Sequence, residues 1–325
     1  MRRIGLVLLA GSLILAPLTA GAEQPKTLPR IGFLLMGAPQ AGLTSAFDAF
    51  REGLHELGWT ENENIVIEYR WAGESPHRLP ELAADLVRLK VDIIIASTPG
   101  VRAAQHATTS IPIIMCIADD AVKQGFVSNL ARPGGNITGM AAFASEFAGK
   151  RLQLLREATP RVSRVALLWN PPGSSPDYMK DTEMAARSLG VTLQSVEIRT
   201  ADDFGRAFTS VLKGRAEALV VGPGQFLFTH QRRVVEFALK NRLPSIYAWK
   251  DPVSVGGLIG YGVNIPQVYR RAAYYVDKIL RGTQPGDLPV EQPTKFDLVV
   301  NLRTAKALGL TIPQSLLVRA DEIIQ

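Results

Sequence analysis

Short apolar runs alternate along the chain with longer stretches in which apolar residues recur every three or four positions. The first run, residues 30–36, is followed by a stretch that places Phe47, Phe50 and Leu54 on one helical face, with Gly58 as its stop. The runs are apolar at successive positions rather than at alternate ones. They therefore predict strands buried on both faces, as in parallel sheets that are covered by helices.

The order strand, helix, strand, helix, strand, helix, strand occurs twice. In the first half, the predicted strands are residues 30–36, 65–69, 91–96 and 111–115. The pattern restarts at Arg164, with predicted strands at residues 164–169, 191–198, 218–221 and 243–247. Repeated halves of this kind predict two doubly wound lobes. Because ligands of open parallel sheets bind beyond the carboxyl ends of the strands, two lobes that face each other form a cleft that closes by hinge motion.

The region between the halves and the tail are less regular. Residues 132–139 are rich in Pro, Gly and Asn, which predicts a linker just before the first crossing between lobes. After the second half come a short strand at 258–261, a helical stripe at 268–280 and a last strand at 296–300. With so many elements after the repeat, we expect the chain to cross between the lobes more than once.

The amino terminus predicts export. Arg2 and Arg3 precede an apolar run to Leu18, and Ala20-Gly21-Ala22 has the small-x-small pattern of a cleavage site, so residues 1–22 are interpreted as a signal peptide. The alternative, an uncleaved anchor, needs a run of roughly 20 apolar residues, and this run is shorter. The leader carries no cysteine for a lipid, and a single cysteine, Cys116, cannot form an intramolecular disulfide. These features predict a periplasmic location.

Charge and motifs argue against other classes. The net charge of +6 comes from basic residues scattered among acids, whereas nucleic-acid binding calls for a concentrated patch. None of the four histidines has the spacing of a metal site, and no G-x-S-x-G motif is present. The Gly222-Pro223-Gly224 segment resembles part of a dinucleotide-binding loop, but Leu227 stands where the third glycine of that motif is needed, which argues against a nucleotide site. We therefore expect no catalytic residues, no metal and no cofactor.

Four stretches resemble one family. Residues 131–139, 269–282, 288–296 and 305–313 are similar to motifs of the ABC-transporter substrate-binding family that is related to tryptophan- and tyrosine-binding members. The resemblance covers the chain from about Pro29 to Ile323. It implies a type I periplasmic-binding fold with three crossings, near Met140, Gly262 and Leu288. Lobe 1 would then comprise residues 29–140 plus 263–288, and lobe 2 residues 141–262 plus 289–325.

The resemblance also implies partners. We expect a monomer that binds a small molecule and makes peripheral contact with an inner-membrane ABC permease, which works with an ATPase. Two departures bear on the ligand: the leader lacks a lipid-bearing cysteine, and residues 119–122 read Asp-Asp-Ala-Val where Asp-Pro-Val-Gly is common in the family. A ligand-binding sensor subunit, and an enzyme on the same scaffold, remain alternatives.

Candidate ligand-binding residues lie where the predicted strands end. They are Met36, Gln40, Ser97, Thr98 and Asp119 in the first half, and Trp169, Asn170, Tyr247 and Tyr261 in the second. The segments 222–225 and 247–249 also follow strands of the second half.

Each candidate has two interpretations. The hydroxyls of Ser97 and Thr98, with the free amides of the helix that follows, either bind a ligand carboxylate or cap the helix. Asp119 or its neighbour Asp120 is a candidate partner for a ligand ammonium. The three aromatic residues either stack on an aromatic ligand or belong to the core. From these features and the family, an aromatic amino acid or aromatic carboxylate is the expected ligand.

Overall fold

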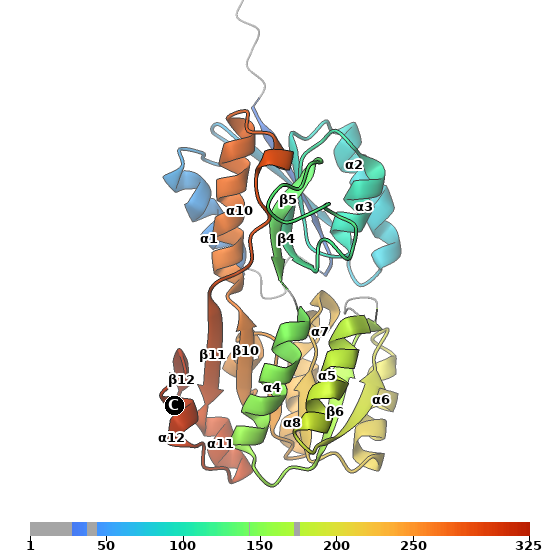
Figure 1. The fold of residues 1–325 in the computed structure, drawn as a ribbon, viewed down its shortest axis with the longest axis vertical. Coiled ribbons are helices and arrows are strands. Elements are labelled where there is room, and N and C mark those ends of the chain that lie inside the picture. The colour runs from blue at the N-terminus through green and yellow to red at the C-terminus, as the bar shows by residue number, and fades with distance from the viewer. Residues whose placement is uncertain (1–27, 38–43, 143, 172–175) are drawn as a thin grey trace, which may run out of the picture.

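The computed structural model describes residues 28–37, 44–142, 144–171 and 176–325 (Figure 1). The expected signal peptide and the candidate Gln40 lie outside these ranges. Within them, no helix has both the length and the apolar character needed to cross a membrane.

The upper half of Figure 1 is lobe 1, a parallel sheet with helices on both faces. Its strand order is β2-β1-β3-β4-β5, with β1 (Arg30–Leu35), β2 (Val66–Trp71), β3 (Ile93–Ala96), β4 (Ile113–Asp119) and β5 (Ile137–Ala142). Helices α1 (Thr44–Glu56) and α10 (Ile265–Leu280) cover one face, and η1 (Pro76–Arg78), α2 (Leu79–Arg88) and α3 (Gly100–Ala107) lie on the other side. Helix α10 comes from the distant tail of the chain, as its orange colour shows.

The successive apolar residues of β3 explain this layering. Ile93 and Ile95 point into the core that holds Phe33 and helix α1, whereas Ile94 and Ala96 point into the core beneath α2. All four are fully buried. A strand side chain alternates between faces, so only a strand covered on both sides buries every position.

The lower half is lobe 2, whose sheet has the order β12-β11-β10-β9-β8-β6-β7. Its strands are β6 (Arg164–Trp169), β7 (Thr192–Glu197), β8 (Ala218–Val221), β9 (Ser245–Tyr247), β10 (Ile259–Val263), β11 (Phe296–Asn301) and β12 (Glu322–Ile324). The β10–β11 pair is antiparallel, and the other pairs are parallel.

Helices cover both faces of this sheet as well. One core lies under α4 (Ala144–Ala158), α5 (Pro176–Ser188), α11 (Leu302–Leu308) and α12 (Gln314–Leu317). The other lies under α6 (Asp203–Lys213) and α8 (Gln231–Lys240), next to the short helix α7 (Gln225–Thr229). A further short helix, α9 (Asp251–Ser254), follows β9.

The expected linker at residues 132–139 is only partly a linker, because its last three residues begin strand β5. Gly139 adopts φ +120°, and a Cβ there would lie 2.5 Å from the backbone nitrogen of Met115 on β4. Glycine is thus required by the close approach of two strands rather than by a turn. Buried Thr138 also ties β5 to the tail, donating from its hydroxyl to the Leu288 carbonyl at 2.7 Å.

Within the described residues, the chain passes between the lobes three times: after β5, between β10 and α10, and ahead of β11. The third passage is fastened to β5 before it leaves lobe 1, because Glu291 exchanges backbone hydrogen bonds with Gly139 and Ala141, each 2.9 Å long. The Glu291 carboxylate also receives two hydrogen bonds from Arg271 of α10. The predicted fold class, two doubly wound lobes joined by a three-crossing hinge, is confirmed.

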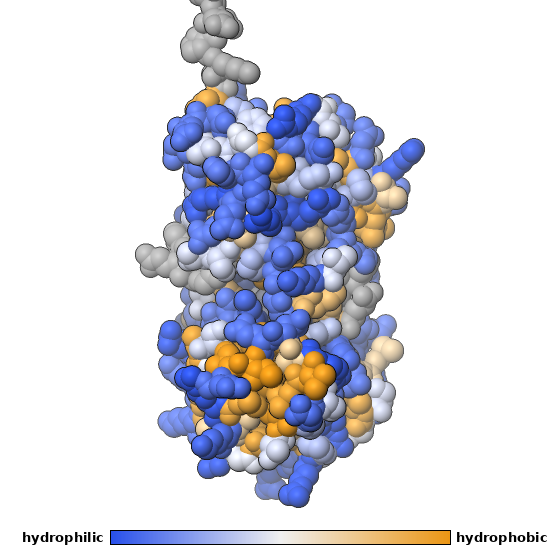
Figure 2. Space-filling view, turned by 90° about the vertical axis from the view of Figure 1, so that its left-hand side faces the viewer, coloured by the Kyte–Doolittle hydropathy of each residue, from blue (hydrophilic) through white to orange (hydrophobic). Residues whose placement is uncertain are grey.

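The surface differs between the lobes on the side that carries β11 and β12. Figure 2 shows this side, with mostly hydrophilic side chains on lobe 1 and a gathering of hydrophobic ones on lobe 2. The last elements of the chain lie here, and they bring Val318 and Ile323 to the surface.

Gly262 provides a test of how closely the second crossing is packed. A Cβ at this position of β10 would lie 1.8 Å from the backbone carbonyl oxygen of Ala248, the residue after β9, and Gly262 itself is held by its pairing with Asp297 of β11. We expect Gly262→Ala to lower the free energy of unfolding by about 1–3 kcal/mol, measured by urea denaturation.

The matched control is Gly205→Ala in helix α6, where nothing lies within 4 Å of the added Cβ. Alanine is a better helix former than glycine, so the free energy of unfolding of this variant should rise by up to about 1 kcal/mol. Equal stability of the Gly262→Ala variant and the unaltered protein would show that β9 and β10 are not packed as described.

Candidate ligand-binding site

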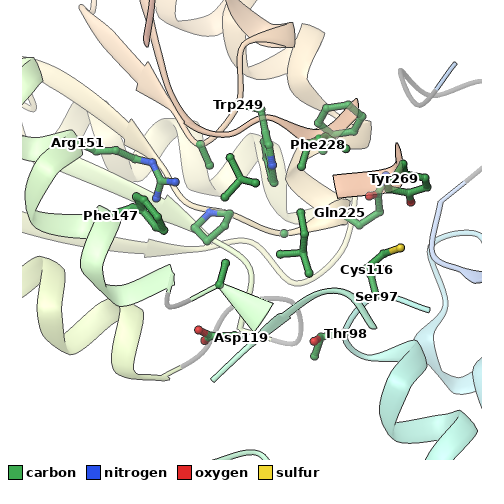
Figure 3. Close-up of a pocket in the computed structure, with 17 residues that line it drawn as sticks. Ser97, Thr98, Cys116, Asp119, Phe147, Arg151, Gln225, Phe228, Trp249 and Tyr269 are labelled. Carbon is green, nitrogen blue, oxygen red and sulfur yellow. The ribbon is translucent and has the colours of Figure 1, made fainter. Parts of the chain in front are cut away.

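A cavity of about 170 Å³ lies between the lobes, where the carboxyl ends of the strands of both sheets meet (Figure 3). Its walls come from lobe 1, from lobe 2 and from the start of α10 after the second crossing. This is the position at which an open parallel sheet binds its ligand.

The lobe 1 wall is formed by residues that follow β3 and by the end of β4. Ser97 and Thr98 come directly after β3, and Asp119 is the last residue of β4. Both Cys116 and Ile117 line the cavity, although successive residues of a regular strand point to opposite faces. The register of β4 shifts here, and Ile117 adopts φ +61°, which is unusual for a β-branched residue. The bulge therefore turns two neighbouring side chains toward the same space.

Strand ends of lobe 2 supply the opposite wall. Pro223, Gly224 and Gln225 follow β8, and Trp249 follows β9. Phe228, one turn further along α7, packs edge-on against Trp249 with 5.3 Å between ring centroids. Figure 3 shows the Trp249 ring at the upper side of the cavity, between Arg151 and Phe228. This wall offers a flat apolar surface that is held from behind by a second ring.

Helix α4 adds the cation of the site. Phe147 and Arg151 both line the cavity and lie one turn apart on the helix. Arg151 is only 3% exposed. Its Nε donates to the Tyr261 carbonyl at 2.8 Å, and its Nη1 lies 3.5 Å from the Tyr178 hydroxyl. Among the described residues, no carboxylate forms an ion pair with it.

Burial keeps the thiol of Cys116 and the hydroxyl of Tyr269 neutral in the cavity. Desolvation raises the pKa of the Cys116 thiol to about 12, and it raises the pKa of Tyr269, which comes from α10, far above its usual range. Neither group carries charge near neutral pH. The charges at the cavity wall are therefore those of Arg151 on lobe 2 and Asp119 on lobe 1.

Two buried polar atoms of the wall have no hydrogen-bond partner among the described residues. They are Oγ1 of Thr98, on lobe 1, and Nε2 of Gln225, on lobe 2. A buried donor or acceptor without a partner costs about 1–3 kcal/mol. A ligand that bonds to both recovers this cost and bridges the lobes.

Two side-chain contacts join the lobes. Nε2 of His230, which precedes α8, lies 3.0 Å from the Glu74 carboxylate, and Lys123 pairs with Asp177 of α5. Glu74 and Lys123 belong to lobe 1, and their partners belong to lobe 2. Both contacts need the lobes to lie as close together as they do in this structure.

The structure brings together three of the residues that the sequence singled out, namely Ser97, Thr98 and Asp119. Gln40 lies outside the described residues. The other five do not line the cavity.

Two of these five lie in the cores. Met36 is buried in the core beneath α2. Tyr247 is 1% exposed in the core beneath α6 and α8, because its ring points into the lobe at the end of β9 instead of beyond it. Burial holds its hydroxyl neutral by raising its pKa well above the usual range.

The remaining three are held by neighbours within lobe 2. Trp169 donates from Nε1 to the Ser195 hydroxyl at 2.9 Å, and buried Asn170 donates to the Ile198 carbonyl at 2.8 Å. Tyr261 reaches the site only through its backbone carbonyl, which accepts from Arg151. Its ring packs beside Phe147.

Sequence reasoning did not single out Phe147, Arg151, Phe228 or Tyr269, all of which lie on helices rather than at strand ends. One signal for Arg151 was present. It falls within the apolar stripe of α4, next to buried Leu152 and Leu155, where a surface helix would carry a hydrophobic residue.

A tyrosine-binding protein from Clostridioides difficile (strain R20291) is 28% identical to this chain over 277 residues, which is 82% of this chain and 77% of that protein.

Two solved structures are also similar. One is the ABC domain in complex with L-Trp from Streptococcus pneumonia, with a TM-score of 0.82 and 23% identity, covering 92% of this chain and all of that one. The other is the ligand-free, open structure of a substrate-binding protein with adhesive properties from Clostridium difficile. Its TM-score is 0.66 and its identity 26%, and the match covers 92% of this chain and 99% of that one. The likeness shows the type I periplasmic-binding-protein fold.

The family model described as ABC transporter substrate binding protein matches residues 39–324. Its members bind a substrate for transport and are not enzymes. This chain therefore belongs to the ABC-transporter substrate-binding protein family.

Proposed function

We propose that this protein is the periplasmic solute-binding component of an ABC importer, and that it captures an aromatic amino acid or aromatic carboxylate between its lobes. The observation that carries the proposal is the closed cavity, which takes an aromatic wall and unpartnered polar atoms from both lobes. The closed lobes then present a joint surface to the permease and its ATPase. The signal peptide at residues 1–22 delivers the protein to the periplasm, where it acts as a monomer.

We propose that the lobes move as β1 to β5 plus α10, close to residues 29–140 plus 263–288, against α4 to β10 plus β11 to β12, close to residues 141–262 plus 289–325. A ligand shifts the equilibrium between open and closed forms only through contacts that differ between them. Thr98 and Gln225 provide such contacts, because they lie on opposite lobes and face one cavity only when it is closed. The higher TM-score against the L-Trp complex than against the open, ligand-free structure supports assigning this structure to the closed form.

The aromatic preference rests on Trp249, Phe228, Phe147 and Tyr269. A stacked or edge-on ring pair adds about 0.5–1.5 kcal/mol beyond burial. The names of two relatives, which mention tyrosine binding and an L-Trp complex, support the same class.

The ligand is found by a thermal-shift screen of residues 23–325 against amino acids, aromatic acids, sugars and nucleosides. At 100 times its dissociation constant, a ligand adds about 2.7 kcal/mol to the stability. We expect an aromatic amino acid or acid to be the hit and to be recovered unchanged. In the variant Trp249→Ala, its affinity should fall roughly tenfold or more, as measured by calorimetry.

Tyr247→Phe is the matched control for Trp249→Ala, since Tyr247 lies two residues away on the same strand end but in the core. The Tyr247→Phe variant should bind the ligand found in the screen with the same affinity as the unaltered protein. A hit among sugars alone, or a Trp249→Ala variant that binds normally, would contradict the proposed ligand class.

Cys116 gives a built-in probe of opening, because it is the single cysteine of the chain and lines the cavity. The thiolate is the reactive form, and a pKa raised to about 12 leaves almost none of it at pH 8. We expect the thiol reagent dithiobis(nitrobenzoate) to label Cys116 of the native protein far more slowly than Cys116 of the urea-unfolded chain. Labelling should be slower still when ligand holds the lobes closed. Labelling at the unfolded rate, or a rate that ligand does not change, would place Cys116 outside the closed cavity.

A further inference from the structure

We infer that Arg151 is the receptor for an anionic group of the ligand, so that the substrates of this protein are aromatic or similarly flat acids and not their neutral analogues. The inference rests on the proposed function and specifies the ligand that this cavity accepts. It concerns a residue on helix α4, away from the strand ends where the sequence predicted the site.

The first argument is the burial of the Arg151 guanidinium. It is 3% exposed, and no carboxylate of the described residues pairs with it. A buried charge without a counter-charge costs several kcal/mol, and proteins normally pair it. Arginine remains protonated in proteins, so deprotonation offers no relief. A ligand anion in the cavity supplies the missing charge.

The second argument is how few hydrogen bonds the protein itself makes to the guanidinium, which otherwise lies beside the rings of Phe147 and Tyr178. Nε is taken by the Tyr261 carbonyl at 2.8 Å, and Nη1 makes a long contact of 3.5 Å with the Tyr178 hydroxyl. The hydrogen bond from Nε fixes the plane of the group, since the five N–H donors of a guanidinium form a rigid fork. Donors on its outer edge are then held ready for a carboxylate, which arginine binds with two parallel hydrogen bonds.

The third argument is the sign of charge on the opposite wall. Asp119 lines the cavity with Ser97 and Thr98, on lobe 1, whereas Arg151 lines it from lobe 2. Figure 3 shows Arg151 beside Phe147 and apart from Asp119 and Thr98. A ligand carboxylate at Arg151 meets a cation, whereas lobe 1 brings no Lys or Arg side chain to the wall among the described residues. The anionic end of the ligand therefore lies against α4, and its polar or cationic end lies against lobe 1.

Arg151 also connects ligand charge to the hinge. Its helix begins directly after the first crossing, and its hydrogen-bond acceptor, Tyr261, lies in β10 just before the second. An anion that binds Arg151 thus acts on the two segments about which the lobes turn.

The test on the ligand side needs no variant. Calorimetry compares the unaltered protein with pairs that differ only in charge: L-tyrosine with L-tyrosinamide, L-tryptophan with L-tryptophanamide, and 4-hydroxyphenylacetate with its amide. Because loss of one partner of a buried charge pair costs 2 kcal/mol or more, each acid that binds should do so roughly 30-fold or more tightly than its amide.

The test on the protein side uses Arg151→Gln and Arg151→Lys. In Arg151→Gln the preference for acid over amide should fall to less than about threefold, with the acid losing affinity and the amide not. Arg151→Lys keeps the charge and should keep part of the preference. Arg156→Gln is the control, because Arg156 lies on the same helix and also donates to a backbone carbonyl, that of Val162, but does not line the cavity. It should retain the full preference.

The outcomes separate this inference from the proposed function. Equal binding of acid and amide by the unaltered protein, or a preference that survives in Arg151→Gln, overturns the role of Arg151 and leaves solute capture standing. Binding of a neutral sugar or nucleoside alone overturns both the role of Arg151 and the aromatic ligand. If Arg151→Gln does not fold, as judged by circular dichroism, Arg151→Lys decides instead: a preference and an affinity for the acid equal to those of the unaltered protein overturn the role of Arg151.

Discussion

The structure depends on a cation held in a nearly closed space between two lobes. Arg151 is buried where α4 meets β10, and it has a carbonyl of the hinge strand as its fixed partner. A fold rarely keeps an unpaired charge in such a place, because desolvation of the charge opposes folding. The cost is offset when an anion enters, which makes the closed cavity most stable when occupied. Binding and closure are in this way two aspects of one electrostatic interaction.

The remaining features of the site make this interaction specific and reversible. Trp249 and Phe228 give the cavity a flat wall, and the β4 bulge at Ile117 brings two neighbouring side chains to the opposite wall. The ion pair that joins the lobes, Lys123 with Asp177, is partly exposed, and exposed pairs contribute about 1 kcal/mol or less. Such pairs favour closure only slightly, so ligand contacts decide the equilibrium.

Much of the fold could be predicted from the sequence because burial on both faces leaves a pattern, as in the four apolar residues of β3. Strand β5 was missed because the glycine required by its close approach to β4 resembles a linker residue. In the site, Ser97 and Asp119 follow from the rule that ligands bind at strand ends. Tyr247 shows the limit of that rule, since the sequence does not tell whether a ring at a strand end points beyond the sheet or into the lobe. The position of Arg151 in the site could not be predicted, because the sequence does not tell which helix faces the cavity.

The central claim, capture by closure, is tested most directly by small-angle X-ray scattering of the protein with and without its ligand. The account predicts that the free protein is more extended than this structure. Saturating ligand should reduce the radius of gyration until the scattering curve matches the structure. In this structure, a carboxylate oxygen of Glu74 on lobe 1 lies 3.0 Å from Nε2 of His230 on lobe 2. Identical scattering curves with and without bound ligand would contradict closure and would show that the ligand binds a cavity whose shape does not change.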